Sequence, residues 1–344
     1  MDPLSQASLG ASLSQSFASN KSKQRIAMVI GALSGMAPDL DVFIRSADNP
    51  TLFLEFHRQF SHSLIFIPVG GLLCALLFYP LMMSRWFQNR WPAAKLSFGQ
   101  IYLFSTLGYA THGLLDACTS YGTQLFWPFS TERFAWNTVS IIDPLFTLPV
   151  VVLVLFAAYR KNVRYARAAF AYAVIYLSLG LVQHHRAESA VYVLAQQRGH
   201  QVERLQVKPS FANRHVWKTI YEYDGRYYVD AVRLLLNTEY ITGSSIQKLD
   251  VRRDFPWLPV DSQQAKDIER FRWFSDGYLA ISRRNPKLIM DVRYSYLPNR
   301  INSMWGVEVN KQLIDEGKLD AHVDYYIKSG ADKKTVQRFM EMVF

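Results

Sequence analysis

The chain has 344 residues, a formal net charge of +10 and a mean hydropathy of −0.02, values that taken alone would fit a soluble basic protein. The charges are unevenly distributed, because the first 183 residues hold only 13 of the 38 Lys and Arg and 8 of the 28 Asp and Glu. This excludes a simple soluble enzyme. It also argues against nucleic-acid binding, since 10 of those 13 basic residues flank apolar segments, as in membrane proteins. Cys74 and Cys118, the only cysteines, lie in apolar segments, which excludes a disulfide framework or a cysteine-rich zinc site.

Residues 1–25 predict an amphipathic amino-terminal helix. Asp2 is typical of an N-cap, and Leu9, Leu13 and Phe17 recur at a four-residue spacing. We expect this helix to lie on the membrane or on neighbouring helices. The stretch lacks a basic start and a continuous apolar run, so no cleavable signal peptide is predicted.

Five apolar segments then predict a mainly α-helical, polytopic membrane domain over residues 26–183. A helix needs roughly 20 residues to cross a ~30 Å hydrocarbon core, and the second and third segments reach that length alone. The first segment is interrupted by Pro38, Asp39 and Asp41, so it either spans or is re-entrant. The segments cover residues 26–37, 64–83, 96–115, 144–159 and 168–182.

Basic residues predict the orientation of these helices. With about five spans, three basic clusters fall on one side, which the positive-inside bias makes cytoplasmic. The carboxyl-terminal part is then expected outside the cytoplasm. The clusters are Lys21, Lys23 and Arg25; Arg85, Arg90 and Lys95; and Arg160, Lys161, Arg164 and Arg167.

Residues 184–344 have the composition of a globular α+β domain. The helix that begins in the last apolar segment should continue to a stop at Gly199, and Asp224-Gly225 between alternating strands predicts a β-hairpin. We also expect helices over 262–277 and 332–344, a second hairpin near Asn285-Pro286 and a strand over 305–309.

Four motifs place ionisable groups where the chain should be apolar. Carboxylates and imidazoles near a bilayer are costly unless they are paired or bound to a metal, so their presence at helix ends suggests function. With the predicted span count, all four motifs lie at the non-cytoplasmic ends of their helices. The motifs are MAPDLDVF (36–43), FHRQFSHS (56–63), THGLLDACTSYG (111–122) and IIDPL (141–145).

The spacing within these motifs suits metal ligands. His112 and Asp116 are four residues apart, which places both on one helical face about 6 Å apart. His57 is expected on a connection, and His62 in the first turn of the following span with Ser61 as its N-cap. Histidine and aspartate ligands without a thiolate suit Zn²⁺, Mn²⁺ or Fe²⁺, and the excess of carboxylates permits one or two ions.

A simpler interpretation remains open for each motif. His112 and Asp116 could form a hydrogen-bonded pair at a helix end, Asp39 and Asp41 could cap a turn, and the His57 region could anchor a helix at the headgroups. The joint occurrence of four such motifs favours a functional site over four separate coincidences.

Taken together, these motifs resemble the YdjM/YbcI-type membrane-bound metal-dependent hydrolases of bacteria. The resemblance rests on MDPLSQASLGA, GALSGMAPDLD, HRQFSHS, HGLLDACTSYGTQLFWPFS and IIDPL, and covers roughly residues 1–185. It implies a bacterial inner-membrane protein, with hydrolase activity inferred from similarity to the helical zinc-dependent phospholipase C and single-strand nuclease fold. It also implies as metal ligands Asp39, Asp41, His57, His62, His112 and Asp116, with Asp143 as a further candidate.

The sequence therefore leads to one main hypothesis and two alternatives. The main one is a hydrolase that cleaves a phosphoester or an ester, lipid-linked substrates included, at the outer face of the membrane. In this hypothesis Arg58 neutralises a phosphate oxygen and Asp143 serves catalysis. The first alternative is a non-catalytic scaffold with a structural metal or an ion-pair cluster. A transporter is the second, although no two-fold repeat supports it.

Overall fold

The computed structural model describes residues 1–18, 20–90 and 95–344, which form two compact units. The helical unit comprises residues 1–43, 57–182 and 211–213, and the sheet unit comprises residues 44–56, 183–210 and 214–344. One continuous helix, α8 (Val163–Gln197), contains the boundary after Val182. Residues 44–56 differ from the expected division, because they group with the sheet unit although they lie within the stretch assigned to the membrane domain.

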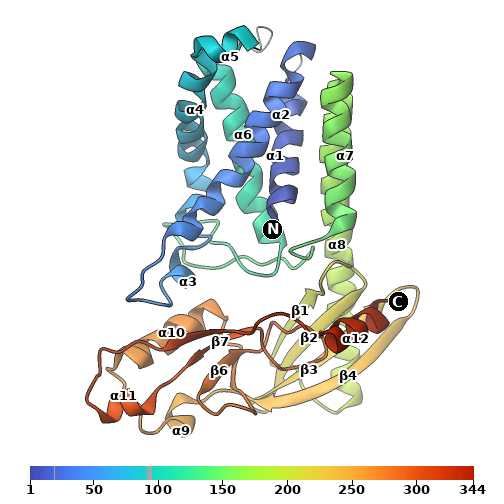
Figure 1. Cartoon of the computed structure of the whole chain (residues 1–344). Coiled ribbons are helices and arrows are strands. Elements are labelled where there is room, and N and C mark those ends of the chain that lie inside the picture. The colour runs from blue at the N-terminus through green and yellow to red at the C-terminus, as the bar shows by residue number, and fades with distance from the viewer. Residues whose placement is uncertain (19, 91–94) are drawn as a thin grey trace. The chain divides into compact units, whose positions relative to one another are not determined.

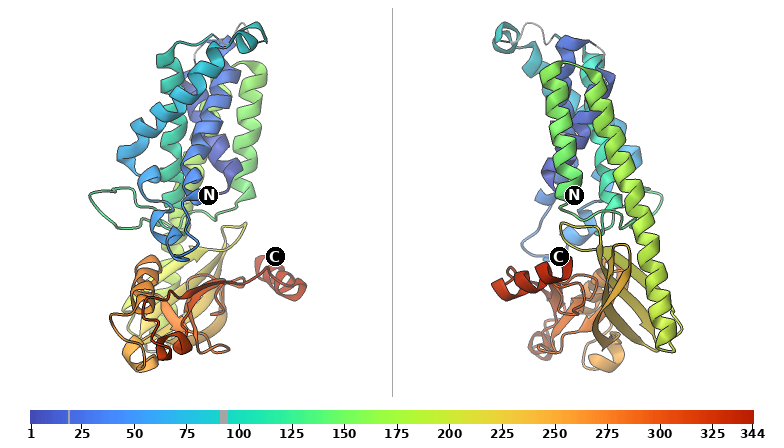
Figure 2. Two further views of the ribbon diagram at one scale, coloured as in Figure 1. Left: turned by 60° about the vertical axis from the view of Figure 1, so that its left-hand side comes forward. Right: turned by 90° about the vertical axis from the view of Figure 1, so that its right-hand side faces the viewer.

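The helical unit is a bundle whose helices run side by side (Figures 1 and 2). Its basic connections, including α5, lie at one end of the bundle, and the amino terminus and the last turn of α6 lie at the other. In chain order its elements are α1 (Pro3–Phe17), η1 (Lys21–Lys23), α2 (Gln24–Met36), η2 (Ala37–Phe43), η3 (Phe60–His62), η4 (Leu64–Phe66), α4 (Ile67–Met83), α5 (Arg85–Arg90), α6 (Phe98–Cys118), α7 (Pro144–Arg160) and the first part of α8, where η denotes a 3-10 turn.

Helix α1 packs against α2, α6 and α7 inside the helical unit, so of the two expected placements it lies on neighbouring helices. The Asp2 side chain caps it by accepting from the backbone N–H of Ser5. Most of its Ser, Gly and Ala side chains are buried, which small residues permit because they let helix backbones approach closely. Some of the buried hydroxyls bond within the helix, as Ser12 Oγ does to Leu9 O at 2.8 Å, and Ser14 Oγ donates to Phe104 O of α6 at 2.8 Å.

Three helical stretches among the described residues are long and apolar enough to cross a membrane: Lys21–Phe43, Leu64–Met83 and Val163–Gln197. The expectation of about five spans is not confirmed. The apolar helix α7 has only 17 residues. Helix α6 has 21 residues but carries buried polar side chains, including Ser105, Thr111, His112 and Asp116.

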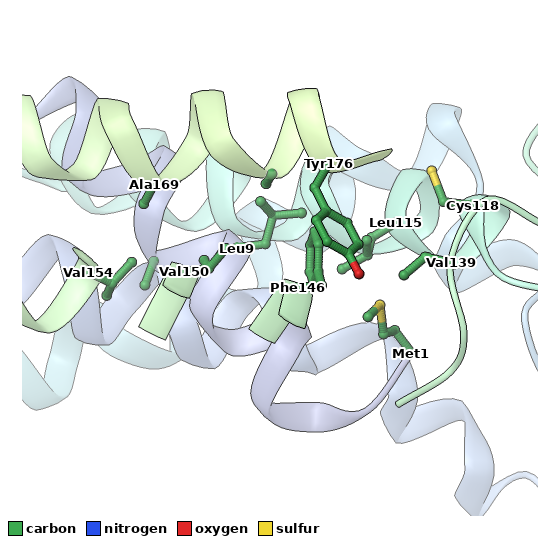
Figure 3. Close-up of a cluster of buried hydrophobic side chains, with 12 residues drawn as sticks. Met1, Leu9, Leu115, Cys118, Val139, Phe146, Val150, Val154, Ala169 and Tyr176 are labelled. Carbon is green, nitrogen blue, oxygen red and sulfur yellow. The ribbon is translucent and has the colours of Figure 1, made fainter. Parts of the chain in front are cut away.

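The core of the helical unit is built between α1, α7 and α8. Phe146 and Tyr176 are buried there, with ring centroids 5.7 Å apart, and Leu9, Val150 and Ala169 pack around them (Figure 3). A second cluster joins α2, α4 and α6 through side chains such as Ile30, Ala75 and Phe104. Burial of this apolar surface fixes α6, which carries two of the polar motif residues.

The sheet unit contains two antiparallel four-stranded sheets, in the orders β1-β2-β3-β4 and β5-β6-β7-β8. The predicted hairpin at Asp224-Gly225 is confirmed, since Tyr223 pairs with Arg226 and both turn residues have positive φ. The strands are β1 (Arg204–Pro209), β2 (Val216–Tyr223), β3 (Arg226–Leu234), β4 (Thr238–Gln247), β5 (Leu279–Ile281), β6 (Leu288–Asp291), β7 (Trp305–Glu308) and β8 (Asp324–Ile327).

Short helices complete the sheet unit. The two predicted helices are confirmed, with Ser262 and Asp332 as their N-caps. The hairpin expected near Asn285-Pro286 joins β5 to β6. The helices are α3 (Phe53–Phe56), the last part of α8, α9 (Val251–Asp254), α10 (Gln263–Phe274), α11 (Lys311–Asp315) and α12 (Lys333–Val343).

Candidate metal centre

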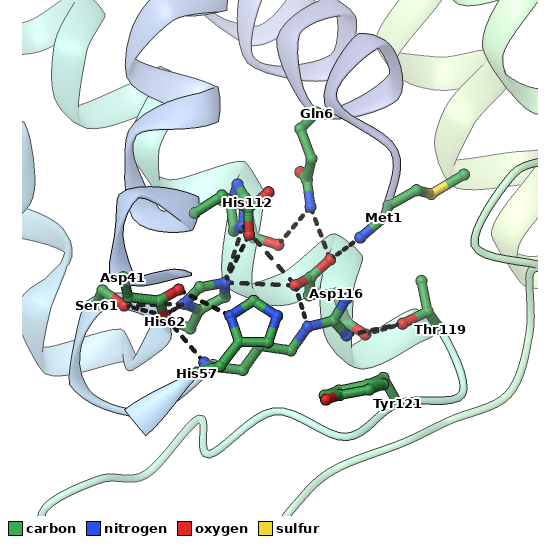
Figure 4. Close-up of polar contacts among 12 residues, drawn as sticks. Met1, Gln6, Asp41, His57, Ser61, His62, His112, Asp116, Thr119 and Tyr121 are labelled. Carbon is green, nitrogen blue, oxygen red and sulfur yellow. Dashed lines mark hydrogen bonds and ion pairs between the residues drawn. The ribbon is translucent and has the colours of Figure 1, made fainter. Parts of the chain in front are cut away.

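Polar residues from three separate parts of the chain converge at one end of the helical unit (Figure 4). After α2, the turn η2 contributes Asp39 and Asp41, because Pro38 replaces the regular helix with a 3-10 turn. The turn η3 contributes His62, and the last two turns of α6 contribute His112 and Asp116. Except for Asp39, these side chains are buried.

Four side chains direct one potential ligand atom each toward a common point. The Nε2 atoms of His62 and His112 are 3.0 Å apart. Asp39 Oδ1 lies 3.5 and 3.3 Å from these two nitrogens, and Asp116 Oδ2 lies 3.4 and 3.8 Å from them. Ligands of a tetrahedral ion with bonds of about 2.0 Å are about 3.3 Å apart, so the spacing fits one such ion.

Hydrogen bonds orient both imidazoles. His112 Nδ1 lies 2.6 Å from the backbone oxygen of Gly35, which can only accept, so this nitrogen carries the proton and Nε2 presents a lone pair. His62 Nδ1 lies 3.2 Å from Asp41 Oδ2 and 3.0 Å from Ser61 Oγ. The His62 proton then lies on Nδ1, toward Asp41, so Nε2 of His62 also presents a lone pair. Two lone pairs that face each other at this distance require a cation or a proton between them, and the carboxylate–histidine arrangement is typical of metal ligands.

Asp41 connects several residues of the site. Its Oδ1 lies 2.8 Å from His57 Nδ1, and its Oδ2 accepts from the backbone N–H of Arg58 at 3.0 Å and from Ser61 Oγ at 2.8 Å. Ser61 is therefore not the N-cap of the following helix; its hydroxyl is used by Asp41 instead. Asp39, Asp41 and His57 form a second group of potential ligands, and Asp39 belongs to both groups.

Arg58 contacts Asp116 from the other side. Its Nε lies 2.9 Å from Asp116 Oδ2, its Nη1 donates to Thr119 Oγ1 at 3.1 Å, and its guanidinium lies over the Tyr121 ring at 4.8 Å. Gln6 Nε2 donates to Asp116 Oδ1 at 2.8 Å, and the amino group of Met1 pairs with the same oxygen. Arg58 thus touches a candidate ligand directly.

Sequence reasoning missed several of these contributions. Gln6 could have been recognised from the sequence, because it is a long polar side chain within a predicted helix of small and apolar residues. The contact of Gly35 with His112 could not have been predicted from residue type, because it is made by a backbone carbonyl. The residues found only in the structure are Met1, Gln6, Gly35, Thr119 and Tyr121.

Asp143 lies outside every group of potential ligands found among the described residues. Its Oδ1 accepts from the backbone N–H groups of Leu145 and Phe146, so that it is the N-cap of α7, and its Oδ2 accepts from Tyr176 Oη at 2.8 Å. These contacts account for the carboxylate without a catalytic or ligand role. A third group of potential ligands, His184, His185 and Glu188, lies on α8.

Comparisons with known proteins bear on the helical part of the chain. A family model described as YdjM inner membrane protein matches residues 1–187. YfhP of Bacillus subtilis, described as an uncharacterized protein, is 30% identical over 119 residues, 34% of this chain and 33% of YfhP. The inner membrane protein YbcI of Escherichia coli is 31% identical over 115 residues, 32% of this chain and 60% of YbcI. The chain therefore spans about a third and three fifths of these relatives' lengths. No solved structure matches the chain significantly.

Proposed function

The chain belongs to the YdjM inner membrane protein family, and from this premise we propose that it is a metal-dependent hydrolase of the inner membrane that cleaves phosphoesters or esters. The observation that carries the proposal is the set of facing nitrogens on His62 and His112 with carboxylate oxygens of Asp39 and Asp116 beside them. Buried groups of this kind are costly without a cation.

The proposed ion would be held by Asp39, His62, His112 and Asp116. Zn²⁺ suits this donor set best, and Mn²⁺ or Fe²⁺ are the other candidates. A divalent ion bound there would supply Lewis acidity, and with a water as a fifth ligand it would lower the pKa of that water toward neutrality. Because Asp39 also belongs to the group with Asp41 and His57, it is the residue that a second ion would share.

Two further residues are available to a substrate. The Nη2 group of Arg58 donates to no described residue, so it can bind an oxygen of a phosphoester, for which a guanidinium is well shaped. His57 is partly exposed and its Nδ1 is held by Asp41, an arrangement that leaves Nε2 free to accept a proton if a single ion is bound. With Asp143 engaged as a helix cap, we assign proton transfer to His57 instead.

Metal content of the purified full-length protein tests the first step of this proposal. Prepared without chelator, the parent should contain about one or two equivalents of a divalent transition metal, and His112→Ala and Asp116→Asn should each lose most of it. His200→Ala is the matched control, because His200 belongs to no group of potential ligands. Stoichiometric metal in the His112→Ala, Asp116→Asn double variant would remove these residues from the site.

A non-catalytic scaffold is the second candidate, and one observation favours it. Both oxygens of Asp116 already face cationic or donor groups from Arg58, Gln6 and Met1, so the cluster can hold the helices together as ion pairs. A screen of fully metallated protein against ester and phosphoester lipids separates the two candidates. Metal-dependent hydrolysis that His112→Ala abolishes supports the enzyme, and its absence across both lipid classes supports the scaffold.

A further inference from the structure

Segment 44–56 joins two parts of the candidate metal centre but folds with the sheet unit. Along the chain it begins directly after η2, which carries Asp39 and Asp41, and it ends directly before His57. Its two ends are therefore fixed by ligand-bearing stretches of the helical unit. Its interior is fixed by contacts within the sheet unit.

Arg270 on α10 makes three polar contacts to this segment. Its Nε donates to Glu55 Oε1 at 2.6 Å, and its Nη1 donates to Thr51 Oγ1 at 2.8 Å and to Asn49 Oδ1 at 3.2 Å. A guanidinium can hold three acceptors in fixed directions, whereas a lysine ammonium would act as a point charge. Arg270 thus holds three side chains of one short segment.

Further contacts within the sheet unit surround Arg270 and the segment. Asp267, one helical turn earlier, is fully buried and lies 3.4 Å from Arg270 Nη1. It also accepts from the backbone N–H of Val323 at 3.1 Å. Phe53 of the segment packs edge-on against Tyr325 of β8, with ring centroids 4.9 Å apart. The segment therefore packs on α10 and β8 of the sheet unit.

Asp41, which precedes segment 44–56, contacts His57 and the Arg58 backbone N–H, which follow the segment. These contacts hold the two ends of the segment together. We propose that Arg270 is a positioning residue for the candidate metal centre, and that one role of the sheet unit is to hold segment 44–56 so that η2 and His57 stay together. Fixing the interior of a loop lowers the entropy cost of bringing its ends into a binding geometry. The effect on metal binding expected from this inference rests on the proposed function, whereas the effect on hydrogen exchange does not.

Hydrogen exchange tests the inference without any metal. In the full-length apo protein, Arg270→Ala should speed exchange in peptides that cover residues 39–43 and 57–62, because the hydrogen bond from the Arg58 amide to Asp41 opens more often. Arg272→Ala is the matched control on the same helix, since the Arg272 side chain pairs with Glu269 and forms no hydrogen bond or ion pair with the segment among the described residues. Unchanged exchange in both peptides of the Arg270→Ala protein would overturn the proposal.

Zn²⁺ affinity, measured by competition with a chromogenic chelator, is the second readout. Arg270→Ala should weaken Zn²⁺ binding on the order of tenfold, the lower end of what losing an outer-shell partner costs, and Arg272→Ala should not. If Arg270→Ala fails to fold, Glu55→Gln tests the same contact from the segment's side and should act in the same direction. Unchanged affinity in both variants contradicts the proposal. A parent protein that binds no Zn²⁺ contradicts the proposed function instead, and the exchange experiment then decides on Arg270 alone.

Discussion

Arg58 adopts a left-handed backbone conformation, with φ of 67°, that a long side chain rarely occupies. Its backbone and its side chain serve different carboxylates, since its amide donates to Asp41 and its guanidinium lies beside Asp116. Its carbonyl accepts from Gln124 N at 3.0 Å. Such strain, on the order of 1–3 kcal/mol, persists only where neighbouring contacts compensate for it, and it concentrates at functional sites.

Arg58→Lys tests whether this side chain serves a substrate. Lysine keeps the positive charge near Asp116 but lacks the paired N–H groups that bind a phosphate oxygen in a fixed direction. We expect near-parental metal content and thermal stability, with turnover of a phospholipid or lipid-linked phosphate lowered by on the order of tenfold or more. The measurements are elemental analysis, a melting curve and the hydrolysis rate.

Arg133→Lys is the matched control for this substitution. The Arg133 guanidinium also lies near the Tyr121 ring, at 5.5 Å, but it donates to the backbone oxygens of Tyr121 and Gly122 rather than facing Asp116. A metal-dependent hydrolysis that falls equally in both variants, or in neither, would remove the phosphate-binding role from Arg58.

Because Lys218 in β2 is buried, we expect the stability of the sheet unit to depend on pH. Burial lowers the pKa of Lys218 to about 7, although its ammonium group donates to Ser295 Oγ and Arg300 O. Between pH 7 and the unfolded pKa the unfolded chain binds a proton that the folded chain does not, so the free energy of unfolding rises with pH. Raising the pH from 7 to 9 should stabilise the sheet unit by about 2 kcal/mol. Burial also lowers the pKa of Lys208, which acts in the same direction.

Thermal unfolding of full-length Lys218→Met at both pH values checks this prediction. The variant should show a smaller rise than the parent, while Lys266→Met, at an exposed position on α10, should match the parent. Above about pH 10 buried Tyr227 opposes the trend, because burial raises its pKa. Equal pH dependence in Lys218→Met and the parent would mean that Lys218 is not the titrating group.

At the scale of elements, α1, α2 and α6 meet through glycines. A Cβ atom on Gly108 of α6 would lie 2.5 Å from the Gly31 backbone oxygen of α2, and one on Gly10 of α1 would lie equally close to that oxygen. Since a backbone oxygen cannot turn aside, any side chain there forces the helices apart. The same helix pair aligns His112 with the Gly35 carbonyl.

Gly108→Ala should therefore weaken both packing and metal binding. We expect a loss of about 1–3 kcal/mol in stability from overpacking, together with weaker Zn²⁺ binding as α6 moves away from α2. Gly99→Ala, on the same helix with nothing within 4 Å of the added Cβ, is the control, and its stability should stay equal or rise slightly. Parental melting temperature and Zn²⁺ affinity in Gly108→Ala would show that the helices tolerate the added methyl group.

At the scale of the whole molecule, the position of the basic segments bears on the orientation of the helical unit in the membrane. The basic turn η1, the helix α5 and the connection between α7 and α8 lie at the same end of the helical unit (Figures 1 and 2). The last turn of α6, which carries Asp116 of the polar cluster formed by Asp39, His62, His112 and Asp116, lies at the other end. This arrangement agrees with basic clusters on one side of the membrane. We therefore propose that the polar cluster lies toward the extracytoplasmic face.

Topology mapping tests this orientation. A reporter fused after Phe344 should behave as extracytoplasmic, and a single cysteine at Asn89 of α5, in a variant without Cys74 and Cys118, should be labelled only from the cytoplasm. A cysteine at Asn162, between α7 and α8, should behave like the one at Asn89. Labelling of these two positions from opposite sides would contradict the predicted arrangement.

The sequence by itself determined the local features of this protein. Uneven charge and apolar runs predicted a helical membrane region followed by a domain with strands, and Asp224-Gly225 predicted its hairpin correctly. The spacing of His112 and Asp116 predicted their shared face on α6. These predictions hold because helix periodicity, turn conformation and hydropathy depend on neighbouring residues.

Only the tertiary structure decided which of these groups meet. The contacts of His62 with His112, of Arg58 with Asp116 and of Asp41 with His57 join residues far apart in the chain, and no periodicity encodes them. The sequence made Asp143 a catalytic candidate and a further candidate ligand, whereas in the structure its carboxylate caps α7. Segment 44–56 lies within the stretch assigned to the membrane domain, but its contacts with Arg270 and Tyr325 place it with the sheet unit. Such pairings depend on how helices pack, because packing maximises burial and hydrogen bonding over the whole unit rather than within one segment.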